Sequence, residues 1–334
     1  ILVMNHPSKI DVAVLITFFV RPDTLQKVFD SVREARPSTL LLWQDGPRLN
    51  RPDDLINIEK CREIVENIDW ECTVYRNYHS DNMGCDPSTF LAQKWAFGLV
   101  DKCIILEDDR VPVQSFYPYC KELLDKYEFD DRINHICGTN LLGDNSNCES
   151  DYFFAQAGST TWATWRRVAK GWDEEYSYLN DNYAMRCLES SVAKPLYKII
   201  LKHAIAHKRE GKQYWETILG MGGLLNNRLA IIPKRNMVVG LTDNSTHAVA
   251  NIKLLPKFAR KMFFMEAYDV SFPLKHPRYI IKDNVYYNTI LENSGIGKPF
   301  KALIYKLDYI LRCIRYGEVK RLFRSLKRRF RSNA

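Results

Sequence analysis

The fold is decided by one stretch of the sequence, Ile104-Ile105-Leu106-Glu107-Asp108-Asp109-Arg110, in which an apolar run ends in three consecutive acids. Val111-Pro112 follows and breaks the pattern. A short apolar run bounded by polar residues and a proline is typical of a buried strand that ends in a loop. Carboxylates just past the C-terminal end of such a strand lie where open α/β sheets bind their ligands. The triplet is therefore either a divalent-metal site that holds a diphosphate or a solvated acidic turn.

Upstream of this stretch, apolar runs alternate with amphipathic patterns. Residues 12–18 are almost continuously apolar, which indicates a central parallel strand buried on both faces. A helix is expected to begin at Arg21-Pro22-Asp23, because proline suits the first helical turn. Repeated strand–helix alternation predicts a Rossmann-like, doubly wound α/β fold, with a mostly parallel sheet flanked by helices. Further strands are expected at 40–44, 72–75 and 103–106, and further helices at 56–68 and 88–99.

Polar residues follow each predicted strand at its C-terminal end. They are Arg21, Asp45, residues 77–82 and residues 107–109. Because the carboxyl ends of parallel strands meet at one sheet edge, we expect these side chains to form one site. The chain has no Walker-type phosphate loop, and the glycine-rich residues 220–223 follow no strand, so they fail as a dinucleotide loop. The sequence thus predicts a phosphate site built from a metal and side chains.

The basic charge of the chain is concentrated at its C-terminal end. The net charge is +8, and residues 298–331 hold 12 Lys or Arg against Asp308 and Glu318, so the remainder is close to neutral. Apolar residues recur at three-to-four spacing on both sides of Gly317. This pattern predicts basic amphipathic helices over 298–334 that lie on an anionic membrane surface. A helical hairpin packed on the body is the alternative, and no recognition motif supports a nucleic-acid partner.

Composition and cysteine usage indicate the compartment. Hydrophobic and charged residues make up 46% and 26% of the chain, as in soluble globular proteins. No apolar run is long enough to cross a bilayer. The nine cysteines are scattered and include no CxxC pair, which favours a reducing compartment and argues against a disulfide framework or a zinc site. We expect a cytoplasmic protein, peripheral on the inner face of the membrane.

Seven short motifs occur in a fixed order along the chain. They occupy residues 14–22, 44–46, 82–85, 104–116, 158–167, 227–236 and 244–247. In this order they resemble the GT-A sugar-nucleotide glycosyltransferases. The likeness is closest to bacterial enzymes known as hemolytic-protein-like or family 2-like glycosyltransferases, and more distant to the EDD-motif N-acetylglucosaminyltransferases. It covers roughly residues 10–280. Thr161, Asp86 and Ser245 depart from the family pattern, and Asp86 replaces an arginine that bears on donor or acceptor identity.

The resemblance implies roles in binding the donor. Asp109, the last acid of the triplet, and the later His247 would hold Mn²⁺ or Mg²⁺. Glu107 and Asp108 would face the ribose hydroxyls and metal-bound water. Each implied contact also has a purely structural interpretation, as a core aromatic, a helix-start charge, a turn former or a structural histidine. The residues implied to hold the rest of the nucleoside-diphosphate sugar, here a UDP-sugar, are Thr17, Phe18, Phe19, Arg21, Asp45 and Asn82.

Two candidates for the catalytic base remain open. In an inverting transfer, a carboxylate deprotonates the acceptor hydroxyl. Asp181 follows the tryptophan-rich segment at a spacing similar to that of the animal enzymes, and Glu216 stands where the bacterial relatives have a Trp-Asp pair. Glu216 is preferred because the bacterial resemblance is closer, and a retaining enzyme would need neither. Trp162, Trp165 and Trp215 would stack on sugar rings, unless they are core residues.

The combined prediction is a metal-dependent glycosyltransferase. It would move a sugar from a nucleoside-diphosphate sugar to a glycan or lipid-linked acceptor in surface-polysaccharide synthesis. A GT-A catalytic domain is expected over residues 10–250, with a nucleotide-binding half at 10–112 and an acceptor half at 113–250. Residues 251–297 would wrap this domain, and 298–334 would form the basic helices. The alternatives are a sugar-nucleotide nucleotidyltransferase, although the loop after the first strand lacks glycine, and a non-catalytic membrane-surface binding protein on a transferase fold.

Overall fold

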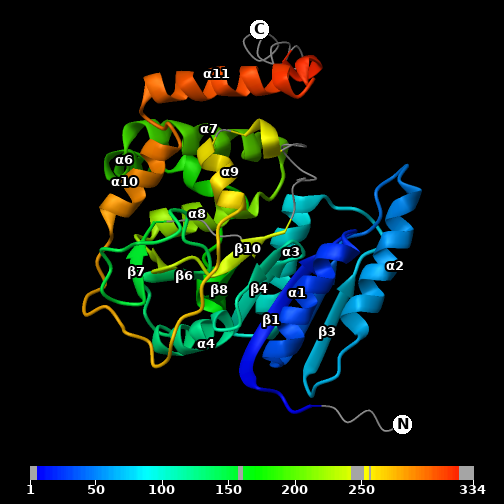
Figure 1. Cartoon of the computed structure of the whole chain (residues 1–334). Helices are drawn as coiled ribbons and strands as arrows, with labels where there is room; N and C mark the ends of the chain where they lie inside the picture. The colour runs from blue at the N-terminus through cyan, green and yellow to red at the C-terminus, as the bar shows by residue number, and fades with distance from the viewer. Residues whose placement is uncertain (1–5, 157–160, 242–251, 256, 323–334) are drawn as a thin grey trace.

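The computed structural model describes residues 6–322, apart from 157–160, 242–251 and 256. Its centre is one mixed sheet with the strand order β3-β2-β1-β4-β8-β6-β9-β7 (Figure 1). Strand β8 runs antiparallel to its neighbours β4 and β6, and β7 runs antiparallel to β9. The strands are β1 (Ile10–Phe18), β2 (Pro37–Gln44), β3 (Thr73–Tyr78), β4 (Lys102–Glu107), β6 (Ile133–Cys137), β7 (Tyr152–Ala155), β8 (Trp162–Trp165) and β9 (Leu229–Pro233).

The strands expected from the N-terminal half form the parallel part of this sheet. Strand β1 lies between β2 and β4, and β3 extends the sheet beyond β2, all in parallel. Thr17 of β1 is in register with Trp43 of β2 and with Glu107 of β4, so these strands end at one level. The predicted α/β fold with a mostly parallel sheet is therefore confirmed, and the polar residues that follow the strands gather at one edge.

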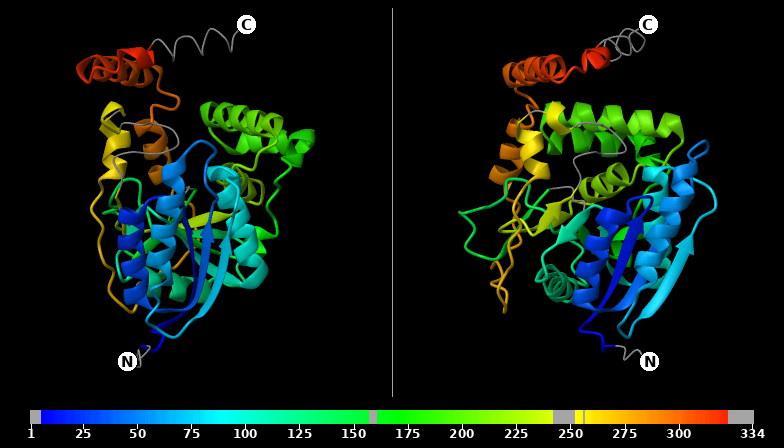
Figure 2. Two further views of the ribbon diagram at one scale, coloured as in Figure 1. Left: turned by 90° about the vertical axis from the view of Figure 1, so that its right-hand side faces the viewer. Right: turned by 45° about the vertical axis from the view of Figure 1, so that its right-hand side comes forward.

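Helices cover both faces of the sheet (Figure 2). On one face Val14 and Ile16 of β1 pack against Leu25 of α1, and on the other Leu15 packs in a cluster with Phe90 of α3. This two-sided burial explains the continuous apolar run of β1. The helices are α1 (Pro22–Ala35), α2 (Pro52–Glu66), α3 (Cys85–Leu99), α4 (Phe116–Lys126), α5 (Arg166–Ala169), α6 (Asn182–Ser191), α7 (Lys194–Glu210) and α8 (Trp215–Leu225).

A second, two-stranded sheet continues from the acid triplet. Strand β5 (Arg110–Pro112) pairs antiparallel with β10 (Val238–Gly240), and Arg110 lies opposite Gly240. The backbone N–H of Leu241 donates to the carbonyl of Asp109 at 3.0 Å. The chain therefore leaves β4, turns through the triplet and enters a strand that is held by a segment far along the sequence.

The C-terminal helices lie at one end of the molecule. They are α9 (Lys257–Phe263), α10 (Asn284–Asn293) and α11 (Pro299–Arg315). Helix α11 is the outermost of them, beyond α7 and α10 in Figure 1. Its predicted apolar stripe faces solvent: Phe300 is 76% exposed and Leu311 65%, with Leu303, Ile304, Leu307 and Ile314 also exposed. This contradicts the packed-hairpin alternative for the part of the tail that is described. None of the described helices is long and apolar enough to cross a membrane.

Substitution of Gly46 can test how tightly the end of β2 is packed. A Cβ atom there would lie 2.5 Å from the backbone of Asp81, which no side-chain rotation relieves. We expect Gly46→Ala to lower the free energy of unfolding by about 1–3 kcal/mol, measured by urea denaturation. The control is Gly98→Ala in α3, where nothing lies within 4 Å, and this variant should be neutral or stabilised by up to about 1 kcal/mol. Equal stability of both variants would contradict the packing.

Candidate functional site

The acid triplet lies where β4 ends and faces the start of α1. Nη1 of Arg21 lies 3.2 Å from Oδ1 of Asp108 and 2.7 Å from Oδ2 of Asp109. The backbone N–H of Phe19 donates to Oδ2 of Asp108 at 3.1 Å. Pro22 occupies the first turn of α1 and so places Arg21 at the N-terminal cap position. The strand end and the helix start are thus joined by charge-assisted hydrogen bonds.

Three carboxyl groups of the triplet lie near two guanidinium groups, those of Arg21 and Arg110. Burial raises the pKa of Asp108 to about 6, although Arg21 acts in the opposite direction. Burial also raises the pKa of Glu107 to about 8, and the charges of Asp109 and Glu216 add to that shift while Arg110 opposes it. Glu107 is therefore mostly neutral at pH 7, and a bound cation would favour the ionised forms of both carboxyl groups.

Asp45 and Asn82 form a turn at the end of β2. Oδ1 of Asp45 accepts from the N–H groups of Gly46 and Met83, and Oδ2 accepts from the N–H of Gly84 and from Nδ2 of Asn82, all within 3.1 Å. Asp45 is only 6% exposed. Four hydrogen bonds occupy its lone pairs, so the carboxylate keeps no acceptor for a base or ribose. This corrects the nucleotide-binding role expected for Asp45 and gives it the turn-forming role; Asn82 serves the same turn.

The end of β1 combines core residues with one accessible ring. Thr17 donates from Oγ1 to the carbonyl of Leu106 at 3.2 Å, and Phe18 is buried with its ring edge-on to Tyr78. Both side chains therefore stabilise the sheet in this structure. Phe19 is half-buried, and the guanidinium carbon of Arg48 lies 5.2 Å from its ring centre. Of Thr17, Phe18 and Phe19, only Phe19 has a side chain that is partly accessible at the edge of the site.

The structure separates the two candidate bases. Asp181 is exposed and caps α6, where its Oδ1 accepts from two backbone N–H groups at 2.9 and 3.0 Å. Glu216 lies in the first turn of α8 and acts electrostatically on Glu107. One side of Glu216 is open to solvent, but burial by the surrounding protein still raises the pKa of its carboxyl, and Asp86 adds to the shift. Glu216 is thus the candidate that shares the environment of the acid triplet.

The three tryptophans expected to bind sugar form part of the core. Trp162 is 1% exposed and Trp165 2% exposed, and the indole N–H of Trp165 donates to the carbonyl of Leu124 at 2.9 Å. Trp162 stacks on Trp215, with ring centres 5.9 Å apart. Neither Trp162 nor Trp165 exposes a ring face to a ligand. Their burial therefore contradicts the sugar-stacking role predicted for them. Trp215 is also buried but lines a pocket.

The described residues do not preform a metal centre. No group of three His, Cys, Asp or Glu side chains among them is arranged to hold an ion, and His247 lies outside the described residues. Asp109 can supply hard oxygen ligands, with Arg21 at 2.7 Å and Arg110 at 3.9 Å from its carboxylate. Mg²⁺ is usually bound by one or two carboxylates together with substrate phosphates. The acids therefore fit a metal that binds together with a diphosphate.

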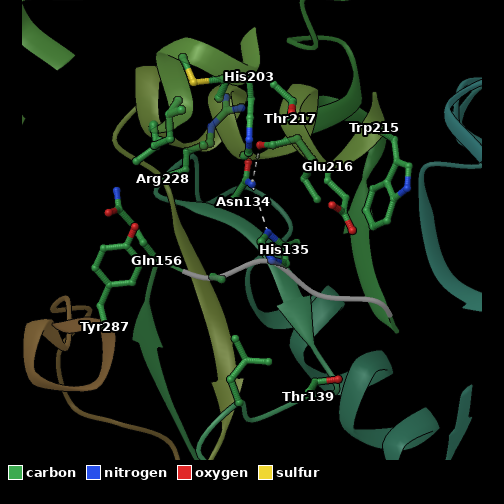
Figure 3. Close-up of a pocket in the computed structure, with 18 of the residues that line it drawn as sticks. Asn134, His135, Thr139, Gln156, His203, Trp215, Glu216, Thr217, Arg228 and Tyr287 are labelled. Carbon is green, nitrogen blue, oxygen red and sulfur yellow. Dashed lines mark hydrogen bonds between the residues drawn. The ribbon is translucent and has the colours of Figure 1, made fainter. Parts of the chain in front are cut away.

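A pocket of about 470 Å³ adjoins this site (Figure 3). Its walls come from β6, β9, α7, α8 and α10, and Glu216 and Arg110 belong to its lining. Because Arg110 also pairs with Asp109, the pocket and the triplet share a wall. The buried polar residues Asn134 and His135 of this pocket were not predicted from the sequence. The available signal was two adjacent polar residues inside the otherwise apolar run Ile133–Cys137.

Comparisons with known proteins add little to this geometry. No family model and no curated protein matches the chain. Two solved structures that resemble it are the 4-diphosphocytidyl-2C-methyl-D-erythritol synthase of Anaerococcus prevotii and HddC of Yersinia pseudotuberculosis complexed with GMP-PN. Each is 9% identical, with a TM-score of 0.29 over 48% of this chain and over 74% and 79% of the respective structures. The fold and the site define a Rossmann-like α/β protein with an acidic site at the carboxyl edge of its sheet.

The pairing of Arg21 with Asp108 can be measured by a double-mutant cycle. Arg21→Met should lower the free energy of unfolding by about 1–3 kcal/mol, because it leaves a buried carboxylate without its partner. Asp108→Asn in that background should cost less than in the wild type. The control is the exposed pair Arg76–Glu66, whose side chains are 41% and 40% exposed and for which the coupling should be about 0–1 kcal/mol. A smaller coupling for Arg21–Asp108 than for this pair would contradict the assignment.

Proposed function

We propose that the chain is a metal-dependent glycosyltransferase, which moves a sugar from a nucleoside-diphosphate sugar to a glycan or lipid-linked acceptor. The observation that carries the proposal is that Glu216 lines the pocket and that its charge also acts on Glu107 of the acid triplet. Direct sugar transfer needs a diphosphate site, a base and a cavity for the second substrate next to one another. The resemblance in sequence supports the GT-A class and a UDP-sugar as the donor.

The donor's diphosphate is proposed to bind at the triplet. Asp109 would hold Mn²⁺ or Mg²⁺, and that cation would supply a Lewis acid for the charge on the leaving group. Arg21 lies next to the same carboxylate and would add a second positive charge to stabilise the leaving group. Phe19 presents its half-buried ring at the end of β1, where a nucleoside would lie. Glu107 and Asp108 supply further carboxyl oxygens next to Asp109, and a bound cation would favour their ionised forms.

Glu216 is the base in this proposal. Its carboxylate takes the proton of the acceptor hydroxyl as that oxygen forms a bond to the anomeric carbon. The bond from the anomeric carbon to the diphosphate oxygen breaks, and the nucleoside diphosphate leaves with the electron pair. Burial and the charge of Asp86 raise the pKa of Glu216, which makes its carboxylate a stronger base. A single displacement of this kind inverts the configuration of the transferred sugar.

Nucleotidyl transfer is the competing enzyme activity. The names of the two similar structures suit it better than sugar transfer, but their TM-scores of 0.29 are too low to carry an argument. The loop between β1 and α1 consists of Phe19, Val20 and Arg21, and it contains no glycine to bring backbone N–H groups close to a triphosphate. The absence of such a glycine favours glycosyl transfer.

Glu216→Gln should abolish the proposed activity. In a panel of nucleoside-diphosphate sugars with Mn²⁺, we expect wild-type protein to release nucleoside diphosphate when acceptor is present, and Glu216→Gln to lose about 10²–10⁴-fold in rate. Nucleotide binding, followed by thermal shift, should persist. The control is Asp181→Asn, which retains the cap of α6 and should retain activity, since asparagine caps helices as well as aspartate does.

The products distinguish the alternatives in the same assay. Release of pyrophosphate from a nucleoside triphosphate and a sugar 1-phosphate would establish nucleotidyl transfer instead. A protein that shows no metal-dependent thermal shift with any nucleoside diphosphate would fit the non-catalytic binding protein.

We further propose that α11 attaches the protein to an anionic membrane surface. Its stripe of Phe300, Leu303, Leu307, Leu311 and Ile314 is at least half exposed along four turns. Lysines and arginines flank the stripe, and each contributes about 1 kcal/mol near an anionic surface. An amphipathic helix of this composition is stable at a bilayer interface, where the apolar face leaves water and the basic residues meet headgroups.

Polar substitution of the α11 stripe tests this attachment. Leu303→Gln with Leu307→Gln should lower binding to phosphatidylglycerol vesicles at least tenfold in a sedimentation assay and leave transfer to a soluble acceptor unchanged. The control is Leu55→Gln with Ile56→Gln in α2, where both side chains are similarly exposed. Equal binding by the two double variants would show that α11 is not the anchor.

A further inference from the structure

The pocket beside Glu216 contains an unusual group of unpaired polar atoms. Oδ1 of Asn134, Nε2 of His135, Oγ1 of Thr139 and Oε1 of Gln156 are buried and have no hydrogen-bond partner among the described residues. Asn134, His135 and Thr139 are 3%, 2% and 8% exposed. An unpaired buried polar atom is destabilising, so such atoms are rare unless a ligand or water supplies the missing hydrogen bond. Four of them in one pocket indicate a binding site.

An irregularity in β6 directs two of these residues to the same side. Ile133 pairs with Leu229 and His135 with Ala230, so β6 has one extra residue, Asn134, opposite its neighbour β9. Successive residues of a regular strand point to opposite faces, whereas a bulge re-aims one side chain. Asn134 and His135 therefore both belong to the pocket, as Figure 3 shows. The bulge makes the polar floor of the pocket.

The hydrogen-bond directions at this floor follow from the neighbouring groups. The carbonyl of Leu219 can only accept, so the group of Asn134 that lies 3.4 Å from it is the donor Nδ2. The same Nδ2 lies 3.1 Å from Nδ1 of His135, which must then accept. Burial lowers the pKa of His135 to about 4, so the ring is neutral at pH 7 and carries its proton on Nε2. The floor thus offers Oδ1 as an acceptor and Nε2–H as a donor.

Apolar side chains form the rest of the wall. Leu219 and Met221 of α8, Ile200 of α7 and Tyr287 of α10 line it. Helix α8 approaches the bulge closely because Gly223 has no side chain; a Cβ atom there would lie 3.0 Å from Nδ2 of Asn134. A wall of this kind suits a ring that has a polar edge and an apolar face, as sugars do.

The two arginines of the lining are already paired. Arg228 donates from Nε to the carbonyl of Asp131 and lies 3.8 Å from its carboxylate, and Arg110 pairs with Asp109. Glu216 adds a negative charge. A phosphate or carboxylate would therefore meet no uncommitted arginine among the described lining residues and would approach a carboxylate. The pocket favours a neutral ligand with hydroxyl groups, since a hydroxyl both donates and accepts.

We infer that this pocket binds neutral, hydroxyl-bearing sugar rings through its unpaired polar groups, those of Asn134 and His135 at the floor and those of Thr139 and Gln156 on different sides of it (Figure 3), with one hydroxyl directed at Glu216. Describing this sugar as the acceptor rests on the proposed function. The binding site itself rests only on the pocket. The sugar is either the free end of a glycan or one carried by a lipid, because both present the same ring.

Saturation-transfer NMR with neutral methyl hexosides tests the inference. The probes are methyl glucoside, galactoside and mannoside and methyl N-acetylglucosaminide, each compared with the corresponding sugar 1-phosphate. We expect at least one neutral probe to bind and its 1-phosphate to bind at least tenfold more weakly. Octyl glycosides of the bound sugar form a second arm, and tighter binding of these would identify the lipid-carried source. Binding of no neutral probe, or stronger binding of the phosphates, would overturn the inference.

A pair of isosteric variants shows whether the binding is in this pocket. Thr139→Val removes an unpaired hydroxyl, so it should leave Tm unchanged or raise it and weaken sugar binding at least fivefold. Thr164→Val removes a hydroxyl that donates to the carbonyl of Asn134 at 2.6 Å and does not line the pocket. It should lower Tm and leave sugar binding within twofold. If Thr139→Val lowers Tm and leaves binding unchanged, Thr139 has only a structural role and the inference fails.

The two proposals fail separately. Donor hydrolysis with no hexoside binding would refute the pocket inference and leave the glycosyltransferase proposal in place. Hexoside binding that Thr139→Val weakens, in a protein that uses no sugar nucleotide, would support the pocket and refute the proposed activity.

Discussion

The candidate site depends on the ion pairs that Arg21 forms with the carboxylates of Asp108 and Asp109. Arg21 and the backbone N–H of Phe19 fix Asp108, and Arg21 also contacts Asp109. These contacts join β4 to the loop between β1 and α1, and they do so at the sheet edge where the strands end together. Without them, three acids that follow a buried strand would repel one another and disorder the turn. Three carboxyl groups face two arginines at this edge, and this excess of acidic groups supports the proposed cation site.

The fold could be predicted from the sequence to a large extent, because burial on both faces leaves a simple signal. The apolar runs ending at Phe18 and Leu106 correspond to β1 and β4, and Pro22 marks the start of α1 as expected. The position of the acid triplet follows from the same pattern. Periodicity does not specify strand order, however, so nothing in the sequence places the antiparallel β8 between β4 and β6.

Individual roles were harder to predict, because the type of a residue does not reveal what already occupies its polar atoms. Asp45 has the position of a ligand-binding residue, but four local hydrogen bonds use its carboxylate. Trp162 and Trp165 have the composition of a sugar platform and lie in the core. Conversely, Asn134 and His135 were not predicted to bind a ligand, because two adjacent polar residues in a short apolar segment give no functional motif. Only the bulge in β6 explains why both lie in the pocket. His247 lies outside the described residues, and its predicted metal contact stays a prediction.

Strand β8 has a consequence for how a protein of this kind can diversify. It separates β4, which ends in the acid triplet, from β6, which carries the floor of the pocket. Its Trp162 is fully buried and stacks on Trp215 at the start of α8, so packed side chains fill the space between β8 and that helix. Substitutions in β6 can therefore reshape the floor of the pocket while the end of β4 keeps its position in the sheet. A protein built on this sheet can change the ligand of its pocket and retain its acidic edge.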